Sequence, residues 1–449
     1  MLVAHQHHAP QPLSNGTRRI LWVRVGGCLP LNSGGRIRSY HTLTHMLNGC
    51  NLRALELHRT QEQPVNGPVA YSHEVERVFF RGLPAWSPRR LPQFAWPLIR
   101  NLVASSEPFA LERYRSRELS NRVRELTLGD DFDLVVCDGL AAATAFEGWE
   151  AERRIPAVLF QHNVESLIWE RLASVQRHLS MKLFFQILAR RMSKREPELC
   201  RSFDGVITIS EEDASYHRDS YGLRNVLGCV PAGATADARG VPQRVIDPPS
   251  SPSLAFLGSM DWLPNQDAVT WFIDEILPKL RQTVPGVKLT IIGRNPPASL
   301  LRMAAEVPGI QFTGTVDEVA SHLRECSLLV VPLRAGSGTR IKILEAMATG
   351  VPVVSTTVGV EGLPLRSNED LLVADDVPGI TNAILRLLKD HVLRRTLSEN
   401  GMQRVMHDFS WQHSAKCFFQ LTDSLPKKHC AHSPDSNVTG VRLNQPDPK

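Results

Sequence analysis

Two cations and one carboxylate lie close together at Arg340, Lys342 and Glu345. Both cations fall where a helix is predicted to begin, and the unpaired backbone N–H groups of a helix start attract anions. Glu345 follows Lys342 by three residues, so the two side chains share one helix face. A carboxylate can accept hydrogen bonds from two neighbouring hydroxyls. These residues would therefore suit a nucleotide, with its phosphates at the helix start and its ribose one turn later.

The segment 333–350, LRAGSGTRIKILEAMATG, is predicted to form a loop and a helix between two strands. The preceding segment 328–331 is short, apolar and rich in branched residues, as buried strands are. Gly336 and Gly338 belong to a loop whose backbone can approach a ligand closely. A glycine and a proline then end the helix, and residues 352–355 complete a predicted βαβ unit.

A histidine and two other polar residues follow another predicted strand, 157–160. They are His162, Asn163 and Glu165. Polar residues just beyond the carboxyl end of a parallel strand point into the ligand crevice of an α/β sheet. A single histidine is more often structural, but this position favours a role in the site for His162. The same argument extends to Asn163 and Glu165.

The first predicted strand, 19–25, leads into a second candidate anion site. Gly34 and Gly35 precede Arg36 at the start of a helix, where backbone N–H groups and a cation could meet a phosphate. Ordinary helix-start chemistry at Ser33 would explain the same residues. Both interpretations stay open on the residues alone.

Length and composition indicate an ordinary globular protein. With 449 residues, two domains are expected, and 42% hydrophobic and 22% charged residues fit that class. The net charge of +5 gives no reason to expect nucleic-acid binding, but it suits anionic substrates or an anionic membrane surface. The eight cysteines show no metal-ligand spacing, so we expect reduced thiols in a cytoplasmic protein.

The N-terminal stretch MLVAHQHHAPQPLSNG does not resemble a signal peptide, and no apolar segment of the sequence is long enough to span a membrane. Its histidines His5, His7 and His8 could chelate a metal. A disordered leader is the simpler interpretation.

Predicted strands and helices alternate through most of the chain, which indicates an α/β fold of two doubly wound, mostly parallel sheets. A proline-rich segment, 237–252, is predicted to link two domains. The expected parts are an N-terminal Rossmann-like domain over 19–237, a C-terminal one over 253–408, a final helix over 409–425 and a disordered tail over 426–449.

The segment 78–103, VFFRGLPAWSPRRLPQFAWPLIRNLV, is rich in arginine, aromatic residues and proline. Aromatic and arginine side chains are typical of segments that lie on a membrane surface. An inserted loop and helix with packed aromatic residues would have the same composition, and the prolines interrupt any long helix. Both interpretations stay open. A second basic stretch, 190–195, is interpreted as a solvated helix face.

The sequence from Ser337 through LEAMATGVPVVS to residues 359–362 resembles the donor site of retaining GT-B glycosyltransferases of family 4. In that family, two glutamates eight positions apart flank the motif. Glu345 matches the second glutamate, which implies ribose binding, whereas the first position is Ser337. His162 likewise resembles the cleft histidine of the family, which lies near the donor sugar.

The resemblance also predicts where the donor diphosphate would lie. Many members carry an arginine directly after the glycine that is Gly258 here, and a lysine six residues later. This chain has Ser259 and Asn265 at those positions. Arg340 and Lys342 are therefore the predicted replacement cations, and a subset of the family with a Gly-x-Gly-x-Arg-x-Lys pattern resembles this chain.

The implied reaction moves a sugar from a nucleotide-diphosphate donor in the second domain to a hydroxyl acceptor in the first, with retention at the anomeric carbon. Cations and helix starts would stabilise the departing diphosphate without a metal. The final helix would return to the N-terminal domain. The candidate catalytic residues are His162, Arg340 and Lys342, and the candidate donor-binding residues are Gly34, Gly35, Gly258, Asn265, Arg294, Ser337, Gly338, Thr339, Arg340, Ile341, Lys342 and Glu345.

The expected partners are a nucleotide sugar and a hydroxyl acceptor, with a lipid-linked glycan of polysaccharide or glycolipid synthesis as the implied acceptor class. No cofactor beyond the donor substrate, no metal and no nucleic acid are expected. The implied location is the cytoplasm, at the inner face of an anionic membrane. A GT-B sugar-nucleotide epimerase and a catalytically silent GT-B subunit are the alternatives. A Rossmann dehydrogenase is disfavoured because no Gly-x-Gly-x-x-Gly opens the first helix.

Overall fold

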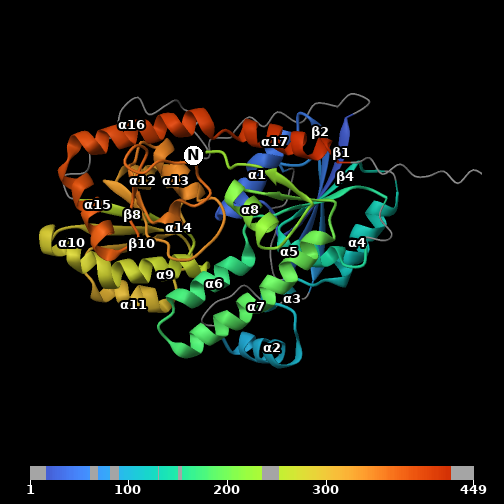
Figure 1. Cartoon of the computed structure of the whole chain (residues 1–449), viewed down its shortest axis with the longest axis horizontal. Coiled ribbons are helices and arrows are strands. Elements are labelled where there is room, and N and C mark those ends of the chain that lie inside the picture. The colour runs from blue at the N-terminus through green and yellow to red at the C-terminus, as the bar shows by residue number, and fades with distance from the viewer. Residues whose placement is uncertain are drawn as a thin grey trace, which may run out of the picture.

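The computed structural model shows two lobes, each built on one sheet (Figure 1). The N-terminal histidines, all but the last residue of the 237–252 linker and the 426–449 tail lie outside the described residues, as do the side chains of 91–95. The described residues are 17–60, 69–80, 91–129, 131–149, 154–234 and 252–425.

The first lobe carries a parallel sheet that has seven strands in the described part of the chain. Successive side chains of a strand point to opposite faces, so Leu21 and Val23 pack into the core on one face while Ile20 and Trp22 pack into the core on the other. In spatial order the strands are β3 (Glu74–Phe80), β2 (Cys50–Arg59), β1 (Arg18–Val25), β4 (Leu134–Asp138), β5 (Ala157–Phe160), β6 (Gly205–Thr208) and β7 (Val226–Cys229).

The second lobe carries a parallel sheet of six strands within residues 252–425. Its central strands read as continuous apolar runs because helices cover both faces of the sheet. The predicted α/β fold with two doubly wound parallel sheets is confirmed. In spatial order the strands are β10 (Ile310–Gly314), β9 (Lys288–Ile292), β8 (Ser253–Leu257), β11 (Leu328–Val331), β12 (Val353–Ser355) and β13 (Leu372–Val373).

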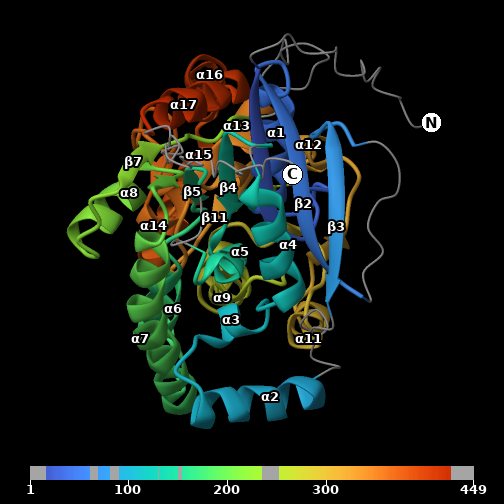
Figure 2. The same cartoon turned by 90° about the vertical axis from the view of Figure 1, so that its right-hand side faces the viewer.

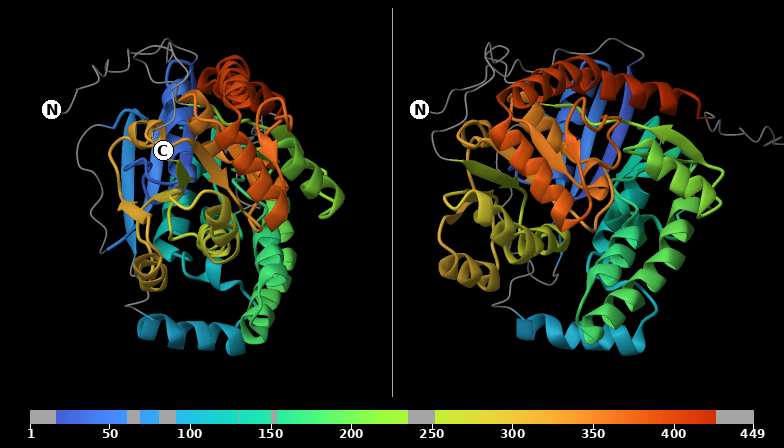
Figure 3. Two further views of the ribbon diagram at one scale, coloured as in Figure 1. Left: turned by 90° about the vertical axis from the view of Figure 1, so that its left-hand side faces the viewer. Right: turned by 60° about the vertical axis from the view of Figure 1, so that its left-hand side comes forward.

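Helices surround both sheets (Figures 1 and 3). Those of the first lobe are α1 (Gly34–Met46), α2 (Leu91–Ala104), α3 (Phe109–Glu112), α4 (Arg117–Leu128), α5 (Leu140–Ala143), α6 (Glu165–Val175), α7 (Leu179–Arg201) and α8 (Glu211–Asp219). The later helices are α9 (Leu263–Trp271), α10 (Leu277–Thr283), α11 (Ala298–Glu306), α12 (Val319–Arg324), α13 (Ile341–Ala348), α14 (Thr357–Val360), α15 (Val377–Lys389), α16 (His391–Asp408) and α17 (Trp411–Asp423).

The last two helices run along one edge of the molecule and span both lobes (Figure 1). Helix α16 packs on α13 and α15 of the second lobe, whereas α17 packs on α1 and β7 of the first. The Arg18 side chain at the start of β1 holds the end of α17 through Asp423, at 2.9 Å, and Thr422, also at 2.9 Å.

One element differs from the sequence-based expectation. The segment 78–103 begins inside the edge strand β3, whose alternating charged residues gave a weak strand signal. In the second lobe, α9 and α10 are joined by a π-helical turn at Phe272–Ile276. Within the described residues, no helix combines the length and apolar character needed to cross a bilayer.

Strand order reverses at one point in each sheet, between β1 and β4 in the first and between β8 and β11 in the second. At such a reversal the connections leave toward opposite faces of the sheet, which opens a crevice beyond the carboxyl ends of the strands. A ligand site is therefore expected beside the residues at these four strand ends.

Candidate active site

A buried carboxylate, Asp138, lies at the reversal point of the first sheet, where β4 ends. Its Oδ2 atom accepts hydrogen bonds from Trp22 Nε1 at 2.9 Å and from Ser39 Oγ at 2.8 Å. The Arg24 guanidinium at the end of β1 lies 3.3 Å from the same oxygen. Burial by itself would raise the pKa of the Asp138 carboxyl, but Arg24 and His162 outweigh it and hold that pKa well below its usual range. Asp138 is therefore ionised throughout the neutral range.

The predicted catalytic residue His162 is held by that carboxylate. Its Nε2 atom pairs with Asp138 Oδ1, and because an ionised carboxylate only accepts hydrogen bonds, Nε2 is the nitrogen that carries a proton. The other ring nitrogen, Nδ1, is buried and has no hydrogen-bond partner among the described residues. In the neutral ring this nitrogen is an acceptor. The geometry leaves it available to a hydroxyl of a bound molecule.

Lys342 lies at the reversal point of the second sheet, in the first turn of α13. Its Nζ atom donates to Asn265 Oδ1 at 2.9 Å and lies 4.7 Å from the centre of the Phe256 ring. A Cβ atom at Gly258 would come within 2.6 Å of the Asn265 amide and 2.9 Å of Lys342 Nζ. The glycine directly after β8 is thus required by the approach of these two polar groups.

Glu345 is partly buried one turn after Lys342, and its carboxylate forms no hydrogen bond or ion pair with any other described residue. Burial raises the pKa of its carboxyl to about 7, although Lys342 acts in the opposite direction. Burial, followed by the nearby Arg340, lowers the pKa of the Lys342 ammonium to about 7. The two groups therefore lie in a polar but poorly hydrated place, where a ligand that supplied charge and hydroxyls would stabilise both charged forms.

Arg294 follows β9 and reaches the end of β8. Its Nε atom donates to Ser259 Oγ at 3.1 Å and lies 3.0 Å from a carboxylate oxygen of Asp261. The family resemblance implies an arginine at position 259 and a lysine at position 265, where this chain has Ser259 and Asn265. In this structure Arg294 contacts the first position and Lys342 the second, so two cations reach the same place from neighbouring segments.

The Arg340 guanidinium is buried and faces its own loop. It donates to the carbonyl oxygens of Ser337, of Gly338 at 2.7 Å and of Val358 at 3.4 Å, and it lies 5.6 Å from the Trp262 ring centre. Burial lowers its pKa to about 10. The sequence-based interpretation placed Arg340 beside a phosphate, whereas the structure shows a side chain that braces the glycine loop.

The glycine loop also touches the first lobe. Ser337 Oγ accepts a hydrogen bond from the backbone N–H of Val164 at 2.8 Å and donates to Asp213 Oδ1 at 3.0 Å. A Cβ atom at Gly338, where φ is +82°, would lie 2.5 Å from the carbonyl oxygen of His162. Thr339 Oγ1 donates to the Ile209 carbonyl at 3.0 Å. The loop therefore brings the second lobe directly against the segment that contains His162.

A second contact between the lobes lies beside this loop. Arg171 of α6 forms two hydrogen bonds with the Glu361 carboxylate, one of them at 2.7 Å, and a third with the Gly336 carbonyl.

Glu165, at the start of α6, has a pKa raised to about 7 by burial and by the nearby carboxyl of Glu196. Glu196 in turn accepts the backbone N–H groups of Glu165 and Ser166 at 2.9 and 3.0 Å.

The remaining predicted residues divide into two groups. Ile341 is buried in the core of the second lobe, so its contribution is to packing. Gly34 and Gly35 are the first residues of α1, and a Cβ atom at either would meet no neighbour within 4 Å. Ile37 in the same turn packs against the second lobe, which places the start of α1 beside the contact between the lobes.

No three His, Cys, Asp or Glu side chains gather as a metal site within the described ranges.

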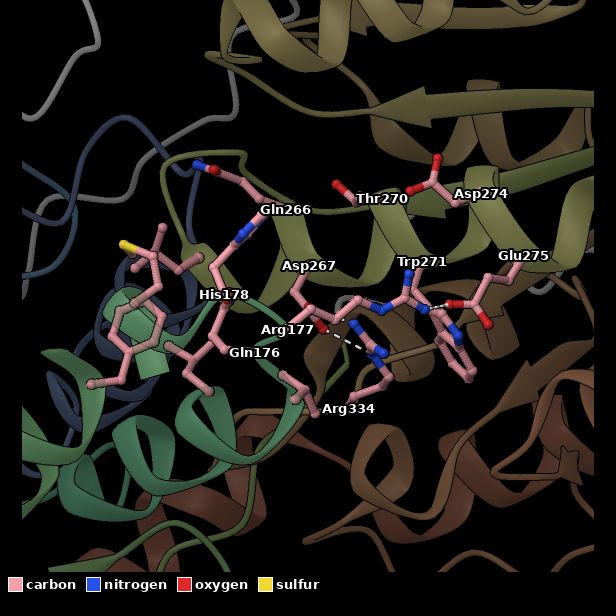
Figure 4. Close-up of a pocket in the computed structure, with 15 residues that line it drawn as sticks. Gln176, Arg177, His178, Gln266, Asp267, Thr270, Trp271, Asp274, Glu275 and Arg334 are labelled. Atoms are coloured by element: carbon pink, nitrogen blue, oxygen red, sulfur yellow. Dashed lines mark hydrogen bonds and ion pairs between the residues drawn. The ribbon is translucent and has the colours of Figure 1, made fainter. Parts of the chain in front are cut away.

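A cavity of about 400 Å³ opens between α6 and α7 on one side and α9 on the other (Figure 4). Leu172, Met181 and Phe185 give it an apolar wall. On the opposite wall Arg334 bridges to Asp267 through contacts of 2.6 and 3.1 Å. The cavity joins the two lobes but lies apart from the Lys342–Glu345 pair, which does not line it.

Sequence reasoning missed the residues that support the site. Asp138 is the last residue of β4 and Arg24 is the last but one of β1, so the argument that selected His162 would have selected Asp138 as well. Asp213, at the start of α8, carried no comparable signal. Its partner Ser337 is more than a hundred residues away in sequence.

Two family models match the chain. Residues 67–234 match Glycosyltransferase Family 4, and residues 251–390 match Glycosyl transferases group 1. Each matched segment corresponds to one of the two lobes.

Related proteins agree with these matches. An uncharacterized 44.6 kDa protein in the cps region of Klebsiella pneumoniae is 22% identical over 407 residues, which cover 86% of this chain and 93% of that protein. A phosphatidyl-myo-inositol mannosyltransferase of Mycolicibacterium smegmatis is 31% identical over 140 residues, covering 30% of this chain and 36% of the mannosyltransferase. The latter match thus spans about a third of the relative.

Solved structures share the whole architecture. Sucrose-phosphate synthase from Thermosynechococcus elongatus superposes with a TM-score of 0.63 at 16% identity, covering 91% of this chain and 99% of the other. Alr3699/HepE of Anabaena, solved in complex with UDP-glucose, superposes with a TM-score of 0.60 at 14% identity, covering 91% and 100%. These likenesses show that the fold is GT-B. With the two family matches, they support a glycosyltransferase of the group 1, family 4 type.

Proposed function

We propose that this protein transfers a sugar, with retention at the anomeric carbon, from a nucleotide-diphosphate sugar to a hydroxyl of a glycan or glycolipid precursor. The observation that carries the proposal is the Lys342–Glu345 pair at the reversal point of the second sheet. A half-buried carboxylate without a partner lies one helix turn from a half-buried cation. This spacing suits a nucleotide whose ribose meets the carboxylate and whose diphosphate meets the cation. The sugar transferases among the relatives give independent support.

In this proposal Glu345 accepts the two ribose hydroxyls, and Lys342 and Arg294 contact the diphosphate. Burial disfavours the protonated form of Lys342. An incoming anion compensates by charge attraction for the hydration that the ammonium group lost on burial. The bond to the sugar breaks with the growth of negative charge on the leaving diphosphate. A cation already placed there stabilises the transition state more than the bound donor.

His162 supplies the first lobe's contribution. Its unpaired Nδ1 atom accepts a hydrogen bond from a hydroxyl of the donor sugar. Asp138 keeps the ring oriented and the proton on Nε2. Arg340 holds the glycine loop in shape and does not contact the phosphates. Ser337 occupies the place of the first family glutamate, but both of its hydrogen bonds go to the first lobe. We therefore assign the donor-sugar contact to His162 and to backbone groups of the loop.

The printed names of two relatives support a choice of acceptor class. The mycobacterial relative is named for transfer to phosphatidyl-myo-inositol, and the Klebsiella relative belongs to a cps region. We propose a lipid-linked glycan precursor as the acceptor, approached from the first lobe.

Incubation with a panel of labelled nucleotide sugars tests the proposal. The expected result is hydrolysis of one donor in water and faster turnover when a lipid-linked hydroxyl acceptor is added. NMR of the product would show the anomeric configuration of the donor preserved. His162→Ala should lower turnover by about a hundredfold while leaving nucleotide-diphosphate affinity unchanged. Epimerisation without transfer would instead identify an epimerase, and the absence of nucleotide binding would indicate a silent subunit.

A further inference from the structure

Large exposed apolar side chains gather on two helices of the first lobe. Of thirteen such side chains in the described part of the chain, seven belong to α2 or to the first half of α7. Single exposed apolar residues are ordinary, but a contiguous group of them marks a contact surface. The seven are Trp96, Ile99, Val103, Leu179, Met181, Leu183 and Ile187.

Six of the seven form a stripe on one face of their helix, whereas Met181 lies on another side of α7. Leu179, Leu183 and Ile187 follow one another at intervals of four residues, so they form one stripe along α7. Arg190 and Lys194 continue the same stripe at the next turns. On α2, Trp96, Ile99 and Val103 share a face in the same way, and Trp96 and Val103 are 71% and 83% exposed.

The two helices lie next to each other at one extremity of the first lobe (Figures 2 and 3). Arg191 of α7 ties them together, because its guanidinium donates to the Asn101 carbonyl at 3.2 Å, the Asn101 side chain at 3.1 Å and the Leu102 carbonyl at 2.8 Å. We call the seven apolar residues together with the nearby cations Lys182, Arg190 and Lys194 the α2–α7 surface.

The charge on this surface has one sign. Neither α2 nor residues 176–195 contain an aspartate or glutamate. Lys182, Arg190 and Lys194 form no ion pair with any described residue, whereas Arg177 is paired with Glu275. The surface thus combines apolar side chains with unpaired cations, which is the chemistry of proteins that rest on anionic lipid headgroups.

We propose that the α2–α7 surface docks on an anionic lipid bilayer, with the apolar side chains at the level of the headgroups and Lys182, Arg190 and Lys194 beside lipid phosphates.

A second copy of the chain is a poorer occupant of this surface. A two-fold contact places the same surface of each copy against the other, so the three unpaired cations would face their own equivalents with no acidic residue between them.

The proposal deepens the proposed function and rests on it only for the acceptor. Met181 belongs both to the α2–α7 surface and to the cavity between the lobes. A lipid-linked acceptor embedded in the bilayer would therefore meet the protein directly beside the contact between the two lobes.

Vesicle flotation of the full chain tests the docking surface without any donor or acceptor. The chain should float with vesicles of equal parts phosphatidylcholine and phosphatidylglycerol and much less with phosphatidylcholine alone, and added salt should weaken the binding. Replacing two cations in Arg190→Gln/Lys194→Gln should weaken binding about 25-fold, at roughly fivefold for each cation. Leu183→Ser/Ile187→Ser should weaken it by about tenfold or more.

The matched control is Leu301→Ser/Val392→Ser, which removes two exposed apolar side chains from the second lobe and should leave flotation unchanged. Circular dichroism and melting temperature establish that each variant is folded. Absence of flotation, equal binding to both vesicle types, or unchanged binding in both surface variants would overturn the proposal. So would a concentration-dependent dimer that the surface variants abolish. Calorimetric nucleotide-diphosphate binding without vesicles is measured in parallel, so failure of the transferase proposal is seen separately.

Discussion

The two reversal points of this molecule differ in how completely their polar groups are satisfied. In the first sheet Asp138 is fully surrounded by donors from Trp22, Ser39, Arg24 and His162. In the second sheet Glu345 has no such partner, and Lys342 has a single hydrogen bond, to Asn265. The same position in the same type of sheet thus holds a completed network in one lobe and an incomplete one in the other.

The difference indicates a division of labour. A satisfied buried network fixes the orientation of its members, so the first lobe presents a histidine in one defined orientation. Groups whose charged forms are disfavoured by burial respond strongly when a charged ligand arrives. The second lobe therefore has the character of a binding site, and the first has that of a positioning site.

The largest effect should come from breaking the completed network. Asp138→Asn leaves the Arg24 guanidinium buried without its counter-charge, and loss of one partner of a buried pair costs about 3–5 kcal/mol of unfolding free energy. Denaturant unfolding measures it. As a control, Glu399→Gln removes the exposed partner of Arg395 and should cost about 0.5 kcal/mol. A cost below about 1 kcal/mol for Asp138→Asn would mean that the network is not structural.

Lys342→Met should affect the second reversal point in the opposite way. Burial already disfavours the charged ammonium, so the ligand-free protein should be as stable as the parent or more stable. Nucleotide-diphosphate binding should weaken by about 1.5–3 kcal/mol, the contribution of a hydrogen bond to a charged group. Calorimetry and thermal melting measure the two quantities, with exposed Lys288→Met as the control. Lower stability with undiminished affinity would assign Lys342 to the fold.

Glu345→Gln should weaken nucleotide-diphosphate binding by about 1.5 kcal/mol or more if the carboxylate accepts ribose hydroxyls. A nucleotide that lacks both ribose hydroxyls sharpens this experiment. Its affinity should be the same for the variant and the parent, because the hydrogen bonds in question are then absent from both complexes. An equal loss with both nucleotides would place Glu345 away from the ribose.

The smallest effect is a pH dependence that Glu345 and Lys342 of the second lobe should contribute together. The pKa of Glu345 is raised from 4.5 to about 7, so its contribution to stability is present below pH 4.5 and is lost as the pH rises through 7. The pKa of Lys342 is lowered from 10.5 to about 7, so stability is regained between pH 7 and 10.5. The ligand-free protein should therefore show a dip of about 1 kcal/mol near neutral pH.

Thermal melting across this pH range, compared with the Lys342→Met/Glu345→Gln double variant, measures that dip. The double variant lacks both titrating groups and should show a flatter profile. A dip that survives in the double variant would have to come from other titrating groups. The raised pKa of Glu165 lowers stability with rising pH in both proteins, so its contribution cancels in the comparison.

The fold could be predicted from the sequence because both sheets are buried on both faces and so appear as apolar runs with helices between them. The proximity of the second-lobe candidates could be predicted as well, since Gly258, Lys342 and Glu345 lie beside predicted strand ends and helix starts. These are local features, which a linear pattern records.

The roles of neighbouring side chains could not be predicted in this way. Arg340 and Lys342 are two residues apart, yet one turns inward to brace the loop and the other faces Asn265. Their difference depends on the backbone at the helix start, where Arg340 is outside the helical region with φ −90° and ψ +77°. The Ser337–Asp213 contact and the approach of Arg294 to Ser259 depend on how distant segments pack.

The glycine at position 338 has a mechanical consequence. Its Cα lies so near the His162 carbonyl that even a methyl group there would come within 2.5 Å of the oxygen. Residue 338 therefore limits how closely the two lobes can approach each other at this contact, and glycine, with only hydrogen as its side chain, allows the closest approach. Any larger side chain at this position would push the loop and the His162 segment apart. The distance between His162 and a ligand bound at the second lobe would then increase.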